Sequence, residues 1–314
     1  MTRIGWRTAL LMTLPPLLWA GNAVVGRMAV GTVPPLALNF LRWAIAALLL
    51  APLGWRAFAR PHEVARRWPQ LLLIGVLGVG LYNSLQYLAL VTSTPINVTL
   101  IAASLPLWML AVGALVYRQH PTRRQLAGAV LSLAGVLFVI LRGDPRALAR
   151  LAFVPGDFYI LAATIAWAFY SWLLVRPPAA LAGAARPDWN WAEFLFVQVV
   201  FGSAFAGACA AGETALGAPP IRWDAHLAWT LAYVAIFPSL IAYRCWGLGV
   251  ARGGPALAAF FSNLTPLFAA LLSSLLLGEA PHWYHAAAFA LIVAGILVSS
   301  RLGPSAARAA RTLA

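Results

Sequence analysis

The chain has 314 residues, of which 62% are hydrophobic and only 10% are charged, and its formal net charge is +14. Soluble globular domains contain roughly a quarter of charged residues, so this composition excludes an ordinary soluble domain and favours a protein whose surface faces lipid. Every basic residue is an arginine, and the arginines fall between apolar stretches. This spacing argues against a nucleic-acid-binding face.

Ten apolar segments follow one another along the chain, and each approaches the length of about 20 residues that a membrane-spanning helix needs. They cover residues 8–29, 35–54, 71–90, 96–117, 125–141, 158–175, 192–211, 227–248, 256–277 and 283–300. None of them alternates with a period of two residues, which argues against a transmembrane β-barrel. The sequence therefore predicts an all-α integral membrane protein with ten transmembrane helices.

The first apolar segment follows Arg3 and Arg7, as the core of a signal peptide would. It is too long for a typical signal peptide and has no clear cleavage site, so we expect it to remain as the first span. With a cytoplasmic N-terminus, fifteen arginines lie in cytoplasmic segments and four lie in external ones. Short cytoplasmic loops are enriched in arginine and lysine. We therefore expect both termini in the cytoplasm and the protein in a bacterial inner membrane.

The second half of the sequence repeats the first. A shift of 160 residues places Pro95, Pro106 and Pro121 on prolines, and Gly135 on a glycine. The prolines reached by this shift are Pro255, Pro266 and Pro281. Each half holds five predicted spans, an odd number, so the two copies must cross the membrane in opposite directions. Inverted repeats of this kind place a substrate site near the membrane midplane, where the halves meet.

Pro106 and Pro266 fall in the middle of the fourth and ninth predicted spans. Proline removes a backbone donor and displaces the carbonyl group four residues earlier. A carbonyl freed in this way must face protein or a wet cavity. Two interpretations stay open, namely a kink that only shapes the bundle and a part in gating or in the substrate site.

Several short motifs resemble the drug/metabolite transporter superfamily, in particular its EamA branch. They are Leu18-Trp19-Ala20-Gly21, Arg42, Pro266-Leu267, Leu277-Gly278-Glu279 and Ala294-Gly295. The resemblance covers nearly the whole chain and implies two EamA-like repeats, residues 1–142 and 143–314, with five helices each. It also implies export of amino acids or related metabolites, with the aromatic-amino-acid exporters as the nearest subgroup. The first repeat departs from the pattern because Gln119 stands where the second has Glu279.

Polar and aromatic side chains inside the predicted spans are the candidates for a substrate site, because a polar group in lipid is costly unless it is satisfied. The candidate substrate-binding residues are Trp19, Asn22, Arg42, Tyr82, Gln86, Trp108, Trp167, Tyr170, Tyr243 and Asn263. The tryptophans either line a cavity suited to an apolar or aromatic group or face lipid and the core. For Arg42, pairing with a substrate carboxylate and a structural role both remain open.

No acidic residue lies near the middle of a predicted span, which argues against a carboxylate proton relay and leaves facilitated diffusion or exchange as the expected mechanism. The sequence has no phosphate-binding loop, so no ATPase part is expected. We also expect no metal, no cofactor and no nucleic acid. A small molecule and the bilayer are the expected partners. The alternatives are a carrier of another metabolite or drug, a passive channel, and a membrane-embedded lipid enzyme.

Overall fold

The computed structural model of the protein describes residues 5–93, 98, 101–150, 154–277 and 282–299, and these residues form helices and connecting turns without a β-strand. The α-helices are α1 (Trp6–Met28), α2 (Pro35–Gly54), α3 (Pro61–Gly75), α4 (Tyr82–Thr92), α6 (Leu105–Leu115), α7 (Arg123–Ile140), α8 (Pro155–Val175), α9 (Trp191–Ala215), α10 (Ala225–Ala235), α11 (Ala242–Gly253), α12 (Pro255–Ser262), α13 (Thr265–Leu277) and α14 (Trp283–Ser299). Short 3-10 helices in the connections are η1 (Trp55–Ala59), η3 (Pro145–Arg150), η4 (Ala179–Leu181) and η5 (Gly183–Ala185).

Six helical stretches are long and apolar enough to cross a membrane, by length and composition. They are Trp6–Gly26, Pro35–Ala59, Pro61–Thr92, Pro155–Val175, Trp191–Ala215 and Ala225–Gly253. Shorter apolar helices cover Leu105–Leu115, Pro255–Ala269 and Trp283–Ser299. The prediction of an all-helical membrane protein is therefore confirmed for the described residues. The third predicted span is longer than expected, because α3 already begins at Pro61, where proline suits the first helical turn.

Two of the long helical stretches each contain a wider, π-helical turn, and the two turns lie at corresponding places in the two halves of the chain. A π-helix, η2 (Val76–Leu81), joins α3 to α4, and a second one, η6 (Ile236–Ile241), joins α10 to α11. The two π-helices lie 160 residues apart, which is the shift that relates the prolines. A π turn leaves a backbone carbonyl without its usual helical donor and often marks a functional site.

The mid-span prolines stand at helix starts and not inside continuous helices. Helix α12 ends at Ser262, a turn follows, and α13 begins at Thr265 with Pro266 in its first turn. Helix α6 likewise begins at Leu105, with Pro106 as its second residue. Proline costs little there, because the first N–H groups of a helix have no intrahelical partner. The expected kink within a continuous ninth span is thus an interruption of the helix.

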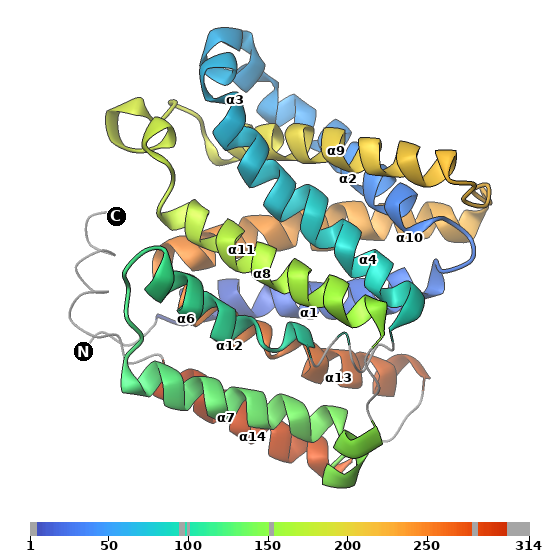
Figure 1. Ribbon diagram of the computed structural model, residues 1–314, viewed down its shortest axis with the longest axis vertical. Coiled ribbons are helices and arrows are strands. Elements are labelled where there is room, and N and C mark those ends of the chain that lie inside the picture. Colours follow the sequence, from blue (N-terminus) through green and yellow to red (C-terminus); the bar gives the residue numbers. More distant parts are fainter. Residues whose placement is uncertain (1–4, 94–97, 99–100, 151–153, 278–281, 300–314) are drawn as a thin grey trace.

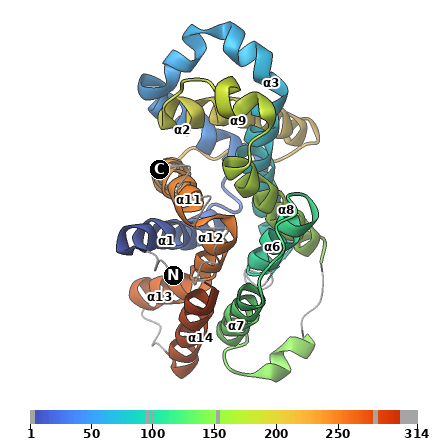
Figure 2. The ribbon, with the colours of Figure 1, turned by 90° about the vertical axis from the view of Figure 1, so that its left-hand side faces the viewer.

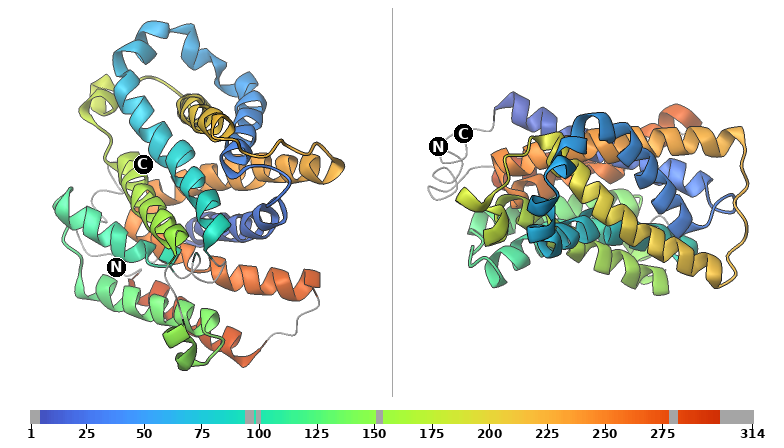
Figure 3. Two further views of the ribbon diagram at one scale, coloured as in Figure 1. Left: turned by 45° about the vertical axis from the view of Figure 1, so that its right-hand side comes forward. Right: turned by 90° about the horizontal axis from the view of Figure 1, so that it is seen from above.

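Helices from the two halves of the chain pack against each other in pairs. Helix α7 packs along α14, α2 along α9, α4 along α8, and α1 along α11. Figures 1 and 2 show the α7–α14 pair at one end of the molecule and α2, α3 and α9 at the other. Figure 3 shows helices from the first half (blue to green) and from the second half (yellow to red) lying among one another and crossing at varied angles. The halves are therefore interleaved, and the centre of the bundle is built from both.

Glycines allow α9 to approach α3 and η2 closely, and α14 to approach α7 closely. A Cβ atom on Gly202 of α9 would lie 2.4 Å from the Cβ of Val79 and 2.5 Å from the carbonyl oxygen of Gly75. In the other pair, a Cβ on Gly295 of α14 would lie 2.7 Å from the carbonyl oxygen of Gly128 in α7. Membrane helices commonly associate through small residues that let their backbones meet.

Candidate functional site

A cluster of aromatic rings occupies the centre of the bundle around Trp167. Its ring centroid lies 4.8 Å from that of Tyr82, 4.9 Å from that of Tyr170 and 5.3 Å from those of Trp19 and Tyr243. These distances and the tilted or edge-on ring planes are those of attractive aromatic pairs. The rings come from α1, α4, α8 and α11, so the cluster joins the two halves of the chain.

A small cavity of about 90 Å³ lies against this cluster. It is lined by Trp19, Tyr82, Gln86, Val98, Ala102, Ala103, Leu105, Trp167, Ser262, Thr265 and Pro266. Four of the ten candidate substrate-binding residues, Trp19, Tyr82, Gln86 and Trp167, therefore meet at one cavity, together with Pro266. Sites for small molecules measure about 300 to 1,000 Å³. At about 90 Å³, the cavity in this conformation is smaller than that range.

The two helix interruptions border this cavity. Leu105, which begins α6, lines it together with Ser262 and Thr265, which flank the break between α12 and α13. Asn263 lies within that break, is only 1% exposed, and finds no hydrogen-bond partner among the described residues for either atom of its side-chain amide. A buried amide without a partner is unusual and calls for an explanation.

Arg42 stands at the centre of a buried hydrogen-bond network. Its Nε donates to Ser239 Oγ at 2.5 Å, and its Nη1 donates to Asn83 Oδ1 at 2.9 Å and to Tyr87 OH at 3.2 Å. Tyr87 OH in turn donates to Asn22 Oδ1 at 3.2 Å. The guanidinium also lies 5.0 Å from the ring centroid of Trp43. The network joins α1, α2, α4 and the π-helix η6.

Several site side chains donate to carbonyl groups of the π-helices. Tyr243 OH donates to the Gly78 carbonyl oxygen in η2 at 2.5 Å, and Asn83 Nδ2 donates to the Val79 carbonyl at 3.2 Å. In the second π-helix, η6, the Pro238 carbonyl accepts a hydrogen bond from the Trp19 indole at 3.2 Å. Trp19 therefore joins the cavity wall to one π-helix directly, and Tyr243 joins the aromatic cluster to the other.

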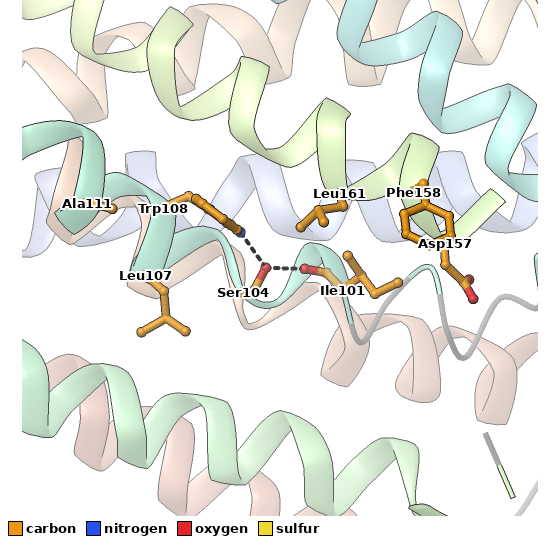
Figure 4. Close-up of a pocket in the computed structure, with 8 residues that line it drawn as sticks. All are labelled: Ile101, Ser104, Leu107, Trp108, Ala111, Asp157, Phe158 and Leu161. Carbon is orange, nitrogen blue, oxygen red and sulfur yellow. Dashed lines mark hydrogen bonds between the residues drawn. The ribbon is translucent and has the colours of Figure 1, made fainter. Parts of the chain in front are cut away.

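Trp108 lies in a different pocket, shown in Figure 4. This pocket, of about 500 Å³, is lined by Ile101, Ser104, Leu107, Trp108, Ala111, Asp157, Phe158 and Leu161. The Trp108 indole donates to Ser104 Oγ at 3.1 Å, and Ser104 donates to the Ile101 carbonyl at 2.5 Å (Figure 4). Trp108 is thus separated from the other predicted site residues and stands beside a mostly apolar hollow between α6 and the start of α8.

Several acidic side chains accept hydrogen bonds from backbone N–H groups at the starts of helices. Glu213 accepts from the N–H groups of Leu36 and Ala37 at the start of α2, and Asp224 accepts from Leu227 N–H at the start of α10. Asp157 accepts from Val154 N–H and from the Ser93 hydroxyl. Among the described residues, no group of three or more His, Cys, Asp or Glu side chains is placed to hold a metal ion. Glu279 lies outside the described residues.

Sequence reasoning missed several members of the centre. Trp246 of α11 lies 5.3 Å from Trp19 and 5.5 Å from Trp167, measured between ring centroids. Sequence reasoning also missed Ser239 and Tyr87, which hold Arg42 together with Asn83, a polar residue inside the third predicted span. The shift of 160 residues places Asn83 on Tyr243, and the Asn83 amide donates to the Tyr243 hydroxyl at 3.0 Å.

A bundle of apolar helices with a partly polar cavity between two interleaved halves is the architecture of a membrane carrier. Comparison with known proteins gives the family. The model of the EamA-like transporter family matches residues 6–141 and, a second time, residues 154–301. The chain therefore belongs to the EamA-like transporter family, which confirms the resemblance read from its motifs.

Relatives along nearly the whole chain carry transporter names. An "Uncharacterized transporter" of Archaeoglobus fulgidus is 26% identical over 94% of this chain and 97% of its own. The "Aromatic amino acid exporter YddG" of Ancylobacter novellus is 28% identical over 91% and 94%, and the "Probable terminal-alkyne amino-acid exporter" of Streptantibioticus cattleyicolor is 25% identical over 93% and 92%. A solved crystal structure superposes with a TM-score of 0.73 at 25% identity, covering 94% of this chain and 96% of the other.

Proposed function

We propose that this transporter exports amino acids, aromatic or otherwise neutral, or closely related metabolites across the inner membrane by alternating access. The observation that carries the proposal is the aromatic cavity between the two halves of the chain, lined by Trp19, Tyr82 and Trp167. Aromatic walls suit an apolar or aromatic side chain. Two relatives of similar length are named as exporters of amino acids, which supports this substrate class.

The mechanism we propose rests on two inverted repeats, residues 1–142 and 143–314, with five membrane-crossing helices each. Three observations support this division. The family model matches the chain twice, the two π-helices lie 160 residues apart, and the packing of α4 on α8 has its counterpart in the packing of α1 on α11. Repeats that can exchange conformations open a central site first to one side and then to the other.

In this proposal the shorter helices also cross the membrane, and both termini are cytoplasmic. The excess of arginine in the segments placed inside supports that orientation. Gln86 and Asn263 supply polar contacts to the backbone part of the substrate, while Pro106 and Pro266 mark the helix interruptions that border the cavity. The acids with assigned contacts lie at helix ends, so exchange or facilitated diffusion is the expected mode.

The proposal is tested by uptake into proteoliposomes of labelled tryptophan, phenylalanine, threonine and methionine. We expect saturable uptake of at least one aromatic amino acid by the wild type and a loss of at least tenfold in Trp167→Ala. The matched control is Trp229→Ala, because Trp229 is 77% exposed on α10, and its uptake should equal that of the wild type. Uptake no greater than in empty vesicles, with protein that elutes as a folded species, would reject the proposal.

A further inference from the structure

Arg42 is a buried charge whose assigned partners are all neutral. The side chain is 1% exposed, and its hydrogen bonds go to a serine hydroxyl, an asparagine amide and a tyrosine hydroxyl. An arginine does not lose its proton in a protein. Burying a charge without an opposite charge is strongly unfavourable, so this guanidinium lacks the partner that would stabilise it most.

The described part of the chain offers no such partner. No hydrogen bond or ion pair joins Arg42 to an acidic side chain among the described residues. Glu213, Asp224 and Asp157 accept hydrogen bonds from backbone N–H groups at helix starts. Within the described residues, the third guanidinium nitrogen, Nη2, has no assigned acceptor, because all of the Arg42 hydrogen bonds come from Nε and Nη1.

The guanidinium is held by α4, the helix that also forms part of the cavity wall. Its partners Asn83 and Tyr87 each follow, by one residue in α4, a residue that lines the cavity, namely Tyr82 and Gln86. One helix therefore contacts both the buried charge and the cavity. A positive charge near a site of low dielectric favours anions and repels cations.

The charge also has no counterpart in the second half. In the second predicted span of each half, a shift of 156 residues places Phe40 on Phe196, and it places Arg42 on Gln198. Gln198 is 2% exposed, and within the described part of the chain its Oε1 has no hydrogen-bond partner. At this pair of positions the first half therefore contributes a positive charge and the second half contributes none.

From this geometry we infer that Arg42 sets the charge preference of the cavity, so that a substrate must carry a carboxylate group and a cation without one is rejected. The inference rests on the proposed function and narrows its substrate class. The carboxylate supplies the opposite charge that Arg42 lacks. It interacts with the guanidinium either through the Asn83 amide and the Tyr87 hydroxyl, or directly when the cavity opens.

The first test uses the wild-type protein. Uptake of labelled phenylalanine is measured against unlabelled phenylalanine and against phenylalaninamide, which keeps the ring and the amino group but has no carboxylate. We expect the amide to compete at least tenfold more weakly. Equal competition by the amide would overturn the inference while leaving amino-acid transport established, whereas no phenylalanine uptake at all would count against the proposed function.

A binding assay decides the charge preference even without uptake. We expect 3-phenylpropionate to raise the melting temperature of the detergent-solubilised protein and 2-phenylethylamine, a cation of similar size, to leave it unchanged. Stabilisation by the amine alone, by both compounds equally or by neither would refute the inference. The variant Arg42→Gln, which introduces the residue found at position 198, should lose the preference, and Arg42→Lys, which keeps the charge, should retain it.

Discussion

The close contact between α9 and the π-helix of the third span gives a sharp test of the packing. In Gly202→Ala the new Cβ would start 2.5 Å from the carbonyl oxygen of Gly75 and 2.4 Å from the Cβ of Val79, whereas ordinary contacts begin at 3.4 Å. Backbone or Cβ atoms must therefore move by nearly one ångström. Overpacking of this kind costs about 1–3 kcal/mol, and lost contacts across the widened interface add to it.

The same helix supplies the control. Gly212 also lies in α9, but a Cβ atom there would meet nothing within 4 Å. Both substitutions raise the helix propensity by up to about 1 kcal/mol. The difference between the stabilities of the two variants therefore reports the packing cost at Gly202. We expect Gly202→Ala to melt about 3–10 °C below Gly212→Ala in detergent, at roughly 2–4 °C per kcal/mol. Melting of Gly202→Ala at or above the control would refute the interleaved packing of the two halves.

Three further substitutions test individual contacts by thermal melting in detergent. Glu213→Ala removes the acceptor for two N–H groups at the start of α2 and should destabilise the protein by about 1 kcal/mol; unchanged melting would show that this cap is dispensable. Trp172→Phe keeps a ring but loses the 2.8 Å hydrogen bond to the Met109 carbonyl, with an expected loss of about 1 kcal/mol. Ser239→Ala removes the acceptor of Arg42 Nε and should cost about 1–3 kcal/mol. A Ser239→Ala protein as stable as the wild type would argue against the Arg42 network.

Much of the fold follows from the sequence because lipid imposes simple rules. Apolar length places the helices, and α2 has the same bounds as the predicted segment 35–54. The shift of 160 residues, read from the prolines, places the residues of η2 on those of η6. It does not reveal that they are π-helices, because a π turn depends on carbonyl partners such as Tyr243, which are supplied by another span.

The candidate site is predicted only in part. Trp19, Tyr82, Gln86 and Trp167 meet at one cavity, because polar and aromatic groups inside a span tend to face protein. Trp108 lies apart from this cavity because a new helix starts at Leu105 and turns the side chain toward another pocket. The composition of a span does not specify which neighbouring helix each of its faces contacts. The partners of Arg42 and the place of Trp246 in the cluster depend on contacts between spans far apart in the chain.

Alternating access through the central cavity is tested most directly by counterflow. Proteoliposomes are loaded with unlabelled tryptophan or with buffer alone, and the initial entry of labelled tryptophan is measured over a range of external concentrations. The account predicts saturable entry that internal tryptophan accelerates several-fold and that Trp167→Ala abolishes. Entry that rises linearly with concentration and is indifferent to internal tryptophan would indicate a channel and contradict the account.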